Sequence, residues 1–318
     1  MSESLIHMQN VSRFYKTVIG VGDVSLELPT GAYGLIGPNG SGKTTLINLL
    51  TGMLSPSLGS VRVFNANPQR ERQVLSRIGL CPATDILYPN ITGFQWVRYQ
   101  VGLHGISGAE AQRRTSESLE QVGMDQNMHS PIGSYSLGMR QRVKVAQAIS
   151  HDPDLLILDE PFNGLDPIGR HELTAFLKDW HAGGKSLILA SHILHEVESV
   201  TSAFLLIYGG RILAAGDASE VRSMLSGFPV EVQLKGDGLR LIVQRLATET
   251  CLDGVEFGAD GRSVKLQVSD GDHLQQQLSE LATQPGVNVE SIDSPDGTLE
   301  AAFELLLKVH RGENRRAP

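Results

Sequence analysis

The chain has 318 residues, of which 41% are hydrophobic and 19% are charged, and its formal net charge is -8. This composition is typical of soluble globular proteins and excludes disordered and fibrous classes. The length allows one large domain or, as we expect, two smaller ones. The acidic balance provides no general basic surface, so no nucleic-acid partner is expected.

The N-terminus and the cysteines point to the cytoplasm. The opening sequence MSESLIHMQNVSRF lacks the charged region and apolar stretch of a signal peptide. Apolar runs such as FLLIY at 204–208 are far shorter than the ~18 residues that a membrane span requires. Cys81 and Cys251 lie far apart, with no Cys or His at metal spacing, so neither a disulfide framework nor a zinc site is expected.

The first functional motif is GPNGSGKTT at 37–45, between an apolar strand predicted over 33–36 and a helix predicted to begin near Lys43. Its glycines allow a tight turn whose backbone N–H groups surround a phosphate, and the helix N-terminus adds positive charge. Lys43 then reaches the β- and γ-phosphates, and Thr44 supplies a hydroxyl ligand for Mg²⁺. The predicted phosphate site therefore comprises Gly37, Pro38, Asn39, Gly40, Ser41, Gly42, Lys43, Thr44 and Thr45.

A second motif, DLLILDE at 154–160, decides between this interpretation and an ordinary glycine-rich turn before a helix. The apolar residues Leu155–Leu158 predict a buried parallel strand that ends at Asp159 and Glu160. Ligands bind at the carboxyl ends of such strands. Asp159 suits the Mg²⁺ shell, and Glu160 can polarise a water molecule. The alternative is that Asp159 and Glu160 are ordinary solvent-exposed acidic residues after a strand. The phosphate-binding loop (P-loop) predicted at 37–45 disfavours this alternative.

Between these motifs stands YSLGMRQRVKVAQAISHDPDLLILDE, and here the chain resembles the ATP-binding subunits of ABC transporters. The resemblance covers residues 4 to about 222. YSLGM at 135–139 is similar to the family's signature, which in most members reads LSGGQ: Ser136 and Gly138 match, whereas Leu137 and Met139 depart. The resemblance implies that Ser136 and Gly138 contact the γ-phosphate of a nucleotide held by the opposite subunit. Taken alone, Ser136 is equally well explained as a helix N-cap.

Other positions acquire roles through the same resemblance. Tyr15 is similar to the aromatic residue that stacks on adenine, with Phe14 as the competing choice. Asp166 in GLDP matches the loop that lines the dimer interface. His192 in ASHILHE matches the switch histidine that hydrogen-bonds the γ-phosphate. A lone histidine after an apolar strand is more often structural, but its place in the motif order favours the functional role.

One position departs from the family in an informative way. Ala83, in IGLCPATDILYPNITG, stands where the family usually has a glutamine whose amide touches Mg²⁺ or the lytic water. Alanine has no amide and cannot make those contacts. Because Glu160 and His192 remain, we expect a slowed or differently coupled ATPase rather than an inactive one.

Helical periodicity over 84–134 predicts a helical subdomain within about 84–150. In it, Trp96 and Tyr99 are either permease contacts or packing residues. Beyond the cassette, the order of strand and helix patterns is β-α-β-β-α-β, typical of a ferredoxin-like unit, and a last helix follows. The predicted domains are therefore 1–222 for the cassette and 223–310 for a small accessory α+β domain, with a tail at 311–318.

The resemblance implies an α/β fold of the P-loop NTPase class and an ATPase with ATP and Mg²⁺ as ligands. It further implies a homodimer around two nucleotides that drives a separate integral membrane permease, of the two-component exporter type, from the cytoplasmic face of the cell membrane. A soluble ABC protein acting on ribosomes or DNA is the main alternative. It is disfavoured because the chain has one cassette, no metal-binding cysteines and no heptads. A P-loop GTPase or kinase is disfavoured by the signature at 135–139 and by the Ser-His pair at 191–192.

Overall fold

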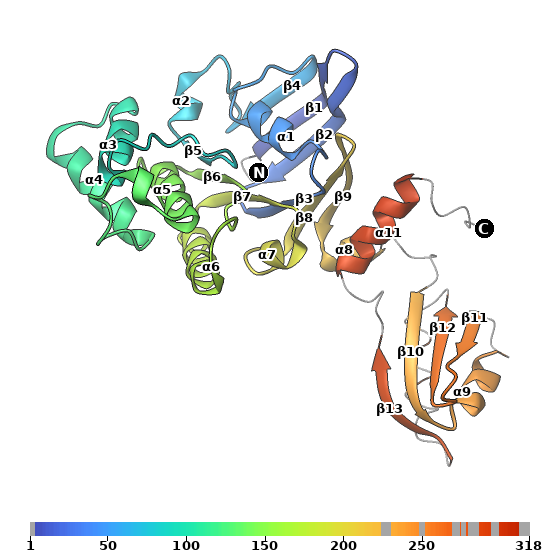
Figure 1. Cartoon of the computed structure of the whole chain (residues 1–318). Helices are drawn as coiled ribbons and strands as arrows, with labels where there is room; N and C mark the ends of the chain where they lie inside the picture. Colours follow the sequence, from blue (N-terminus) through green and yellow to red (C-terminus); the bar gives the residue numbers. More distant parts are fainter. Residues whose placement is uncertain are drawn as a thin grey trace. The chain divides into compact units, whose positions relative to one another are not determined.

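The computed structural model of the chain describes residues 4–223, 230–247, 252–268, 274, 278, 286–293 and 299–311. The chain forms two compact units, Met1–Ala215 and Gly216–Pro318 (Figure 1). The domain limits derived from the sequence, with a division after residue 222, stay a prediction. Residues 312–318 of the predicted tail and most of the helix predicted over 273–284 lie outside the described residues.

A six-stranded sheet in the order β5-β6-β7-β3-β8-β9 forms the centre of the first unit. Five of these strands run parallel, from β5 to β8. The strand predicted over 33–36 and the strand predicted over 155–158 are both present, as β3 and β6. Their uninterrupted apolar residues are explained by burial on both faces of the sheet. The strands are β3 (Ala32–Ile36), β5 (Ile78–Cys81), β6 (Leu155–Asp159), β7 (Ser186–Ser191), β8 (Ala203–Tyr208) and β9 (Arg211–Asp217).

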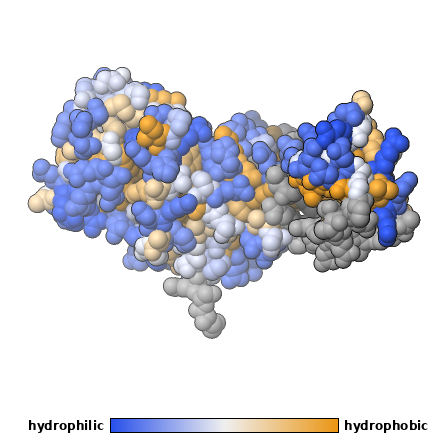
Figure 2. Space-filling model, turned by 90° about the horizontal axis from the view of Figure 1, so that it is seen from below, coloured by the Kyte–Doolittle hydropathy of each residue, from blue (hydrophilic) through white to orange (hydrophobic). Residues whose placement is uncertain are grey.

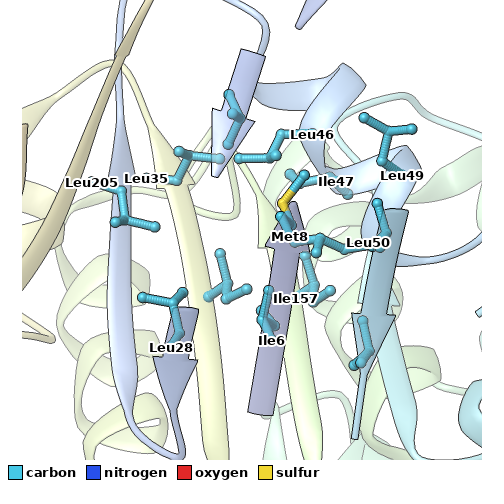
Figure 3. Close-up of a cluster of buried hydrophobic side chains, with 14 of the residues drawn as sticks. Ile6, Met8, Leu28, Leu35, Leu46, Ile47, Leu49, Leu50, Ile157 and Leu205 are labelled. Atoms are coloured by element: carbon cyan, nitrogen blue, oxygen red, sulfur yellow. The ribbon is translucent and has the colours of Figure 1, made fainter. Parts of the chain in front are cut away.

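A second, antiparallel sheet comes from the N-terminal part of the chain, with the strand order β2-β1-β4. Between it and the parallel sheet lies α1 (Lys43–Leu50), which contributes Leu46, Ile47, Leu49 and Leu50 to the core (Figure 3). Burying such side chains stabilises the fold by about 1.5–3 kcal/mol each. The helix that follows the P-loop is therefore fixed on its apolar side. The strands are β1 (Ser4–Tyr15), β2 (Val18–Pro29) and β4 (Leu58–Val63).

Six further α-helices belong to the described part of the first unit, and α3, α4 and α5 contact one another within the predicted helical subdomain (Figure 1). A capping box starts α3: Thr92 Oγ1 accepts from Gln95 N, and Gln95 Oε1 accepts from Thr92 N. Trp96 packs in the interior and donates to Gln147, whereas Tyr99 is 60% exposed. The helices are α2 (Arg72–Leu75), α3 (Gly93–Leu103), α4 (Gly108–Gln121), α5 (Leu137–Ile149), α6 (Pro167–Ala182) and α7 (Leu194–Glu198).

The second unit contains an antiparallel sheet in the order β11-β12-β10-β13. Its described elements occur in the predicted order of strand, helix, two strands and strand, and α9 covers an apolar core that includes Leu234 and Leu266. A final helix is present where the sequence predicted one. The elements are α8 (Ala218–Ser223), β10 (Val230–Asp237), α9 (Leu239–Leu246), β11 (Leu252–Phe257), β12 (Ser263–Val268), β13 (Asn288–Asp293) and α11 (Leu299–Arg311).

Exposed hydrophobic residues form small areas within a mostly hydrophilic surface on the face displayed in Figure 2. In the part of the chain that the structure describes, no helix combines the length and the apolar character needed to cross a bilayer.

Two stacked histidines join the end of α3 to the end of α5. The imidazoles of His104 and His151 lie 3.7 Å apart between centroids with an interplanar angle of 8°. His151 Nε2 lies 3.1 Å from the carbonyl oxygen of Ile78 and donates to it. Burial, then the neighbouring His104 and Arg114, lower the pKa of His151 to about 4, against the hydrogen bond to Ile78 and the charge of Asp152, which raise it. The folded protein therefore holds His151 neutral.

This pair predicts acid destabilisation. Since the pKa of His151 falls from 6.5 to about 4 on folding, the unfolded state binds more protons between these pH values, and stability is lost as the pH falls through this window. The loss is about 1.4 kcal/mol per pH unit at most. His151→Phe keeps a stackable ring without a proton site. Urea unfolding should show a smaller loss between pH 7.5 and 5.5 in this variant than in the wild type.

The control is His171→Phe, at an exposed histidine of α6, which should keep the wild-type pH dependence. An equal loss of stability in wild type and His151→Phe would contradict the prediction.

Candidate functional site

The sheet topology brings the predicted phosphate and carboxylate residues to one edge. In the parallel register, Ile36 of β3 lies opposite Ser191 of β7, and Asp159 of β6 lies opposite Ala190. The P-loop leaves β3 at this edge, Glu160 follows β6, and His192 follows β7. Residues more than one hundred positions apart in the chain thus converge because parallel strands end side by side.

The P-loop is braced from two sides. Gly42 has a φ of 112°, and a Cβ there would lie 2.5 Å from the carbonyl oxygen of Gly20, so only glycine fits both the conformation and the space. On the other side, Gly210 N donates to Ser41 O at 2.8 Å. Lys43 is 6% exposed, and its Nζ donates to Gly37 O at 2.7 Å. The lysine is therefore folded back along the loop, and its ammonium group lies within the turn.

Thr44 and Asp159, the two predicted metal ligands, are in direct contact. Thr44 Oγ1 donates to Asp159 Oδ2 at 2.8 Å. Burial is the largest influence on the pKa of Asp159 and raises it, as does the charge of Glu160, whereas the Thr44 hydrogen bond and the charges of Lys43 and Lys144 lower it. A hydroxyl and a carboxylate in this arrangement are hard oxygen ligands of the type that Mg²⁺ prefers.

Glu160 connects the P-loop lysine to the histidine after β7. Its Oε1 lies 3.5 Å from Lys43 Nζ, and its Oε2 lies 2.9 Å from His192 Nδ1. Because a carboxylate only accepts, Nδ1 of His192 is the donor in this pair and Nε2 remains for another partner. Glu160 has a φ of 53°, which costs about 1–3 kcal/mol for a residue with a side chain. The Glu160 N–H to Ala190 O bond of 2.8 Å helps to hold this conformation.

Three further residues support this arrangement and were missed by sequence reasoning. Ser191 Oγ donates to Glu196 Oε2 at 2.8 Å and lies 3.5 Å from Glu160 Oε2. The other oxygen of the buried Glu196 pairs with Arg170 of α6 at 3.0 Å. The only signal was the position of Ser191 and Glu196 on either side of His192 in SHILHE, since nothing in the sequence couples α6 to this segment.

The signature residues form a second group with the segment before α6. Ser136 Oγ caps α5 by accepting from Met139 N at 3.2 Å, and the contact of Ser136 with a nucleotide stays a prediction. A Cβ on Gly138 would lie 3.1 Å from Gly164 O. Asp166 Oδ1 caps α6 by accepting from Gly169 N at 2.7 Å. The close approach of Gly138 to Gly164 places the start of α5 beside the segment before α6, and the other two contacts are local helix caps.

Tyr15 lies beside the P-loop helix at the end of β1. A Cβ on Gly20 would meet the Tyr15 ring at 2.6 Å and the Thr45 side chain at 3.1 Å. The ring is on the surface, with Arg13 5.1 Å above its centroid. Phe14, the competing aromatic residue, is equally exposed, and its N–H donates to Ser57 Oγ.

Several features of the P-loop group fit a phosphate ligand with a divalent cation. Ser41 Oγ is buried without a hydrogen-bond partner, and Glu160 Oε1 has only its 3.5 Å ion pair with Lys43. Such burial is costly unless a ligand or water completes the hydrogen bonds. Gly40 has a φ of 79° and open space where a Cβ would stand. Asn39, Gly40 and Thr44 are exposed around this opening. The residues therefore provide donors for an anion and oxygen ligands for a metal ion in one place.

Comparison with known proteins agrees with this geometry. The ABC transporter family model matches residues 21–163. The Nod factor export ATP-binding protein I of Cupriavidus pinatubonensis is 35% identical over 238 residues, covering 74% of this chain and 73% of that protein. The uncharacterized ABC transporter ATP-binding protein YdbJ of Bacillus subtilis is 30% identical over 316 residues, covering 98% of both chains.

Solved structures show the same fold. The ATP-binding subunit of an ABC transporter superimposes with a TM-score of 0.64 at 28% identity, covering 70% of this chain and 93% of that one. The dimeric cassette MJ0796 superimposes with a TM-score of 0.62 at 22% identity, covering 67% and 98%. With its P-loop, its paired carboxylates and its signature helix in the arrangement described, the chain belongs to the family of ABC transporter ATP-binding subunits, which are ATPases.

Proposed function

We propose that the chain binds ATP with Mg²⁺ at the P-loop edge of the sheet and that its hydrolysis drives export through a separate membrane permease. One observation carries the assignment of the reacting groups: Lys43, Glu160 and His192 form a continuous chain of contacts beside the Thr44–Asp159 pair. This set combines a cation for phosphates, a proton acceptor and two metal ligands. ATP hydrolysis requires each of these.

Each residue has a distinct role in this proposal. Lys43 exchanges its contacts with the loop carbonyls for the phosphates, and the backbone N–H groups of 37–45 surround them. Thr44 and Asp159 hold Mg²⁺, which neutralises charge on the phosphate oxygens when bound. Glu160 accepts the proton of the attacking water, while His192 Nδ1 fixes the orientation of that carboxylate. Tyr15 provides the aromatic face for adenine.

The signature group acts on a second copy of the chain. Ser136 and Asp166 cap the starts of α5 and α6, and Gly138 lies close to Gly164 in the segment before α6. The α5 N-terminus offers backbone N–H groups to an anion, and a nucleotide held by the opposite copy supplies that anion in a head-to-tail homodimer with two ATP molecules. The dimeric form of a cassette with this fold supports the arrangement.

The partner is an integral membrane permease, and the chain lies at the cytoplasmic face of the cell membrane. A relative named for Nod factor export supports an exporter. Closing and opening of the ATP-dependent dimer then provides the movement that the permease uses.

Replacing the proton acceptor tests the catalytic assignment. Glu160→Gln keeps the size of the side chain but removes its basicity, so turnover of ATP should fall by about 10²–10⁴-fold. ATP binding should persist, and size-exclusion chromatography with ATP should show a stable dimer. Glu198→Gln, at an exposed carboxylate of α7, is the matched control. Equal turnover in Glu160→Gln and the wild type would reject the role of Glu160.

Extraction from native membranes tests the transporter assignment. A tagged chain should co-purify in mild detergent with a protein that has several membrane-spanning helices, identified by mass spectrometry. Recovery with ribosomes, DNA or soluble proteins alone would overturn the permease proposal while leaving the ATPase assignment in place.

A further inference from the structure

A lysine with no carboxylate partner lies inside the first unit. Lys144 of α5 is 4% exposed, and its Nζ donates to Pro82 O at 3.1 Å and to Ala83 O at 3.3 Å. Among the described residues, no carboxylate lies within ion-pair distance of it. Burying an ammonium group without a counter-ion is costly. The position of this lysine therefore requires an explanation other than stability.

The surroundings of Lys144 connect it to the end of β6. Cys81 precedes the two carbonyl acceptors and lies opposite Leu158 in the sheet, one residue before Asp159. Burial raises the pKa of the Cys81 thiol to about 12, and the positive charge of Lys144 acts in the opposite direction. Lys144 thus binds the chain directly after β5, next to the end of β6 that carries the proposed Mg²⁺ ligand Asp159.

A second side chain of α5 binds the same segment one helical turn earlier. Arg140 Nε pairs with Asp85 at 2.8 Å, and its Nη1 donates to Tyr135 O at 2.7 Å. Positions i and i+4 share one face of a helix, so Arg140 and Lys144 together bind residues 82–85. The Arg140 pair is partly exposed and contributes little, which leaves the buried lysine as the main attachment of this segment to α5.

At position 83 the segment has no side chain that could perform this task. Ala83 is exposed and ends in a methyl group, so it offers only its backbone to the site. The lysine reaches that backbone from α5, whose N-cap is the signature residue Ser136. The attachment therefore joins the signature helix to the chain that leaves β5, next to Asp159.

We propose that Lys144 is a positioning residue of the nucleotide site, which holds residues 82 and 83 against α5 and so replaces the side-chain contact that Ala83 cannot make. This inference rests on the proposed ATPase function. The proposal assigns Lys144 no contact with the reacting atoms.

The test compares three full-length variants. Lys144→Met keeps the length of the side chain without the charge, Lys144→Arg keeps the charge, and Lys178→Met removes an exposed lysine of α6 as the matched control. For Lys144→Met we expect kcat for ATP to fall about tenfold with KM changed less than twofold, a loss of about 1.4 kcal/mol. Lys144→Arg should recover most of that turnover, and Lys178→Met should match the wild type.

Hydrogen exchange of the nucleotide-free protein provides a measurement that does not depend on turnover. Amides over 82–92 should exchange several-fold faster in Lys144→Met than in the other two variants, while those of β6 stay protected. Two results overturn the positioning role: exchange over 82–92 that is the same in Lys144→Met and in the wild type, or a kcat of Lys144→Met equal to that of a wild type that hydrolyses ATP. If the wild type itself does not hydrolyse ATP, the proposed function fails, and the exchange result alone decides whether Lys144 holds the segment.

Adding Ala83→Gln to Lys144→Met tests whether the lysine replaces the missing amide. The substitution should raise the kcat of Lys144→Met by a larger factor than it changes the wild-type kcat. Equal factors in the two backgrounds would show that the two positions act independently and would contradict the replacement.

Discussion

The parallel pairing of β3, β6 and β7 is the constraint on which the nucleotide site depends. Parallel strands end at the same edge, so the P-loop, the carboxylates and the histidine meet there without any long-range sequence signal. The apolar residues of these strands and of α1 are buried in one core, which fixes the edge in place. A shift of register by one residue would move Asp159 away from Thr44 and turn its side chain to the other face.

The site contains buried polar groups and a strained backbone whose cost in folding free energy is offset by burial of the apolar core. Glu160 has a left-handed backbone conformation, and one of its oxygens is buried without a hydrogen-bond partner. Ser41 Oγ is likewise buried without a hydrogen-bond partner. Natural proteins retain such features where a ligand completes the interactions. Ser191 and Glu196, which support Glu160, are themselves buried polar residues, so the residues that orient the reacting groups add to this cost.

In the proposed dimer, the two groups of site residues bind different nucleotides. The P-loop edge holds a nucleotide within its own copy, whereas the N-terminus of α5 contacts the nucleotide of the opposite copy. The proposed dimer unites these groups across two copies. Lys144 then provides, within one copy, a physical connection from the signature helix back to the metal edge.

The sequence by itself determined the P-loop between a strand and a helix, the strand that ends beside Asp159 and Glu160, and the order of the described elements of the second unit. Each of these depends on local pattern: apolar runs, glycines at a turn and polar residues at strand ends. Only the tertiary structure decided the pairing of Glu160 with His192, the support from Arg170 and Glu196, and the burial of Lys144 against Pro82 and Ala83. These contacts join segments distant in the chain, and no local periodicity encodes which strands become neighbours.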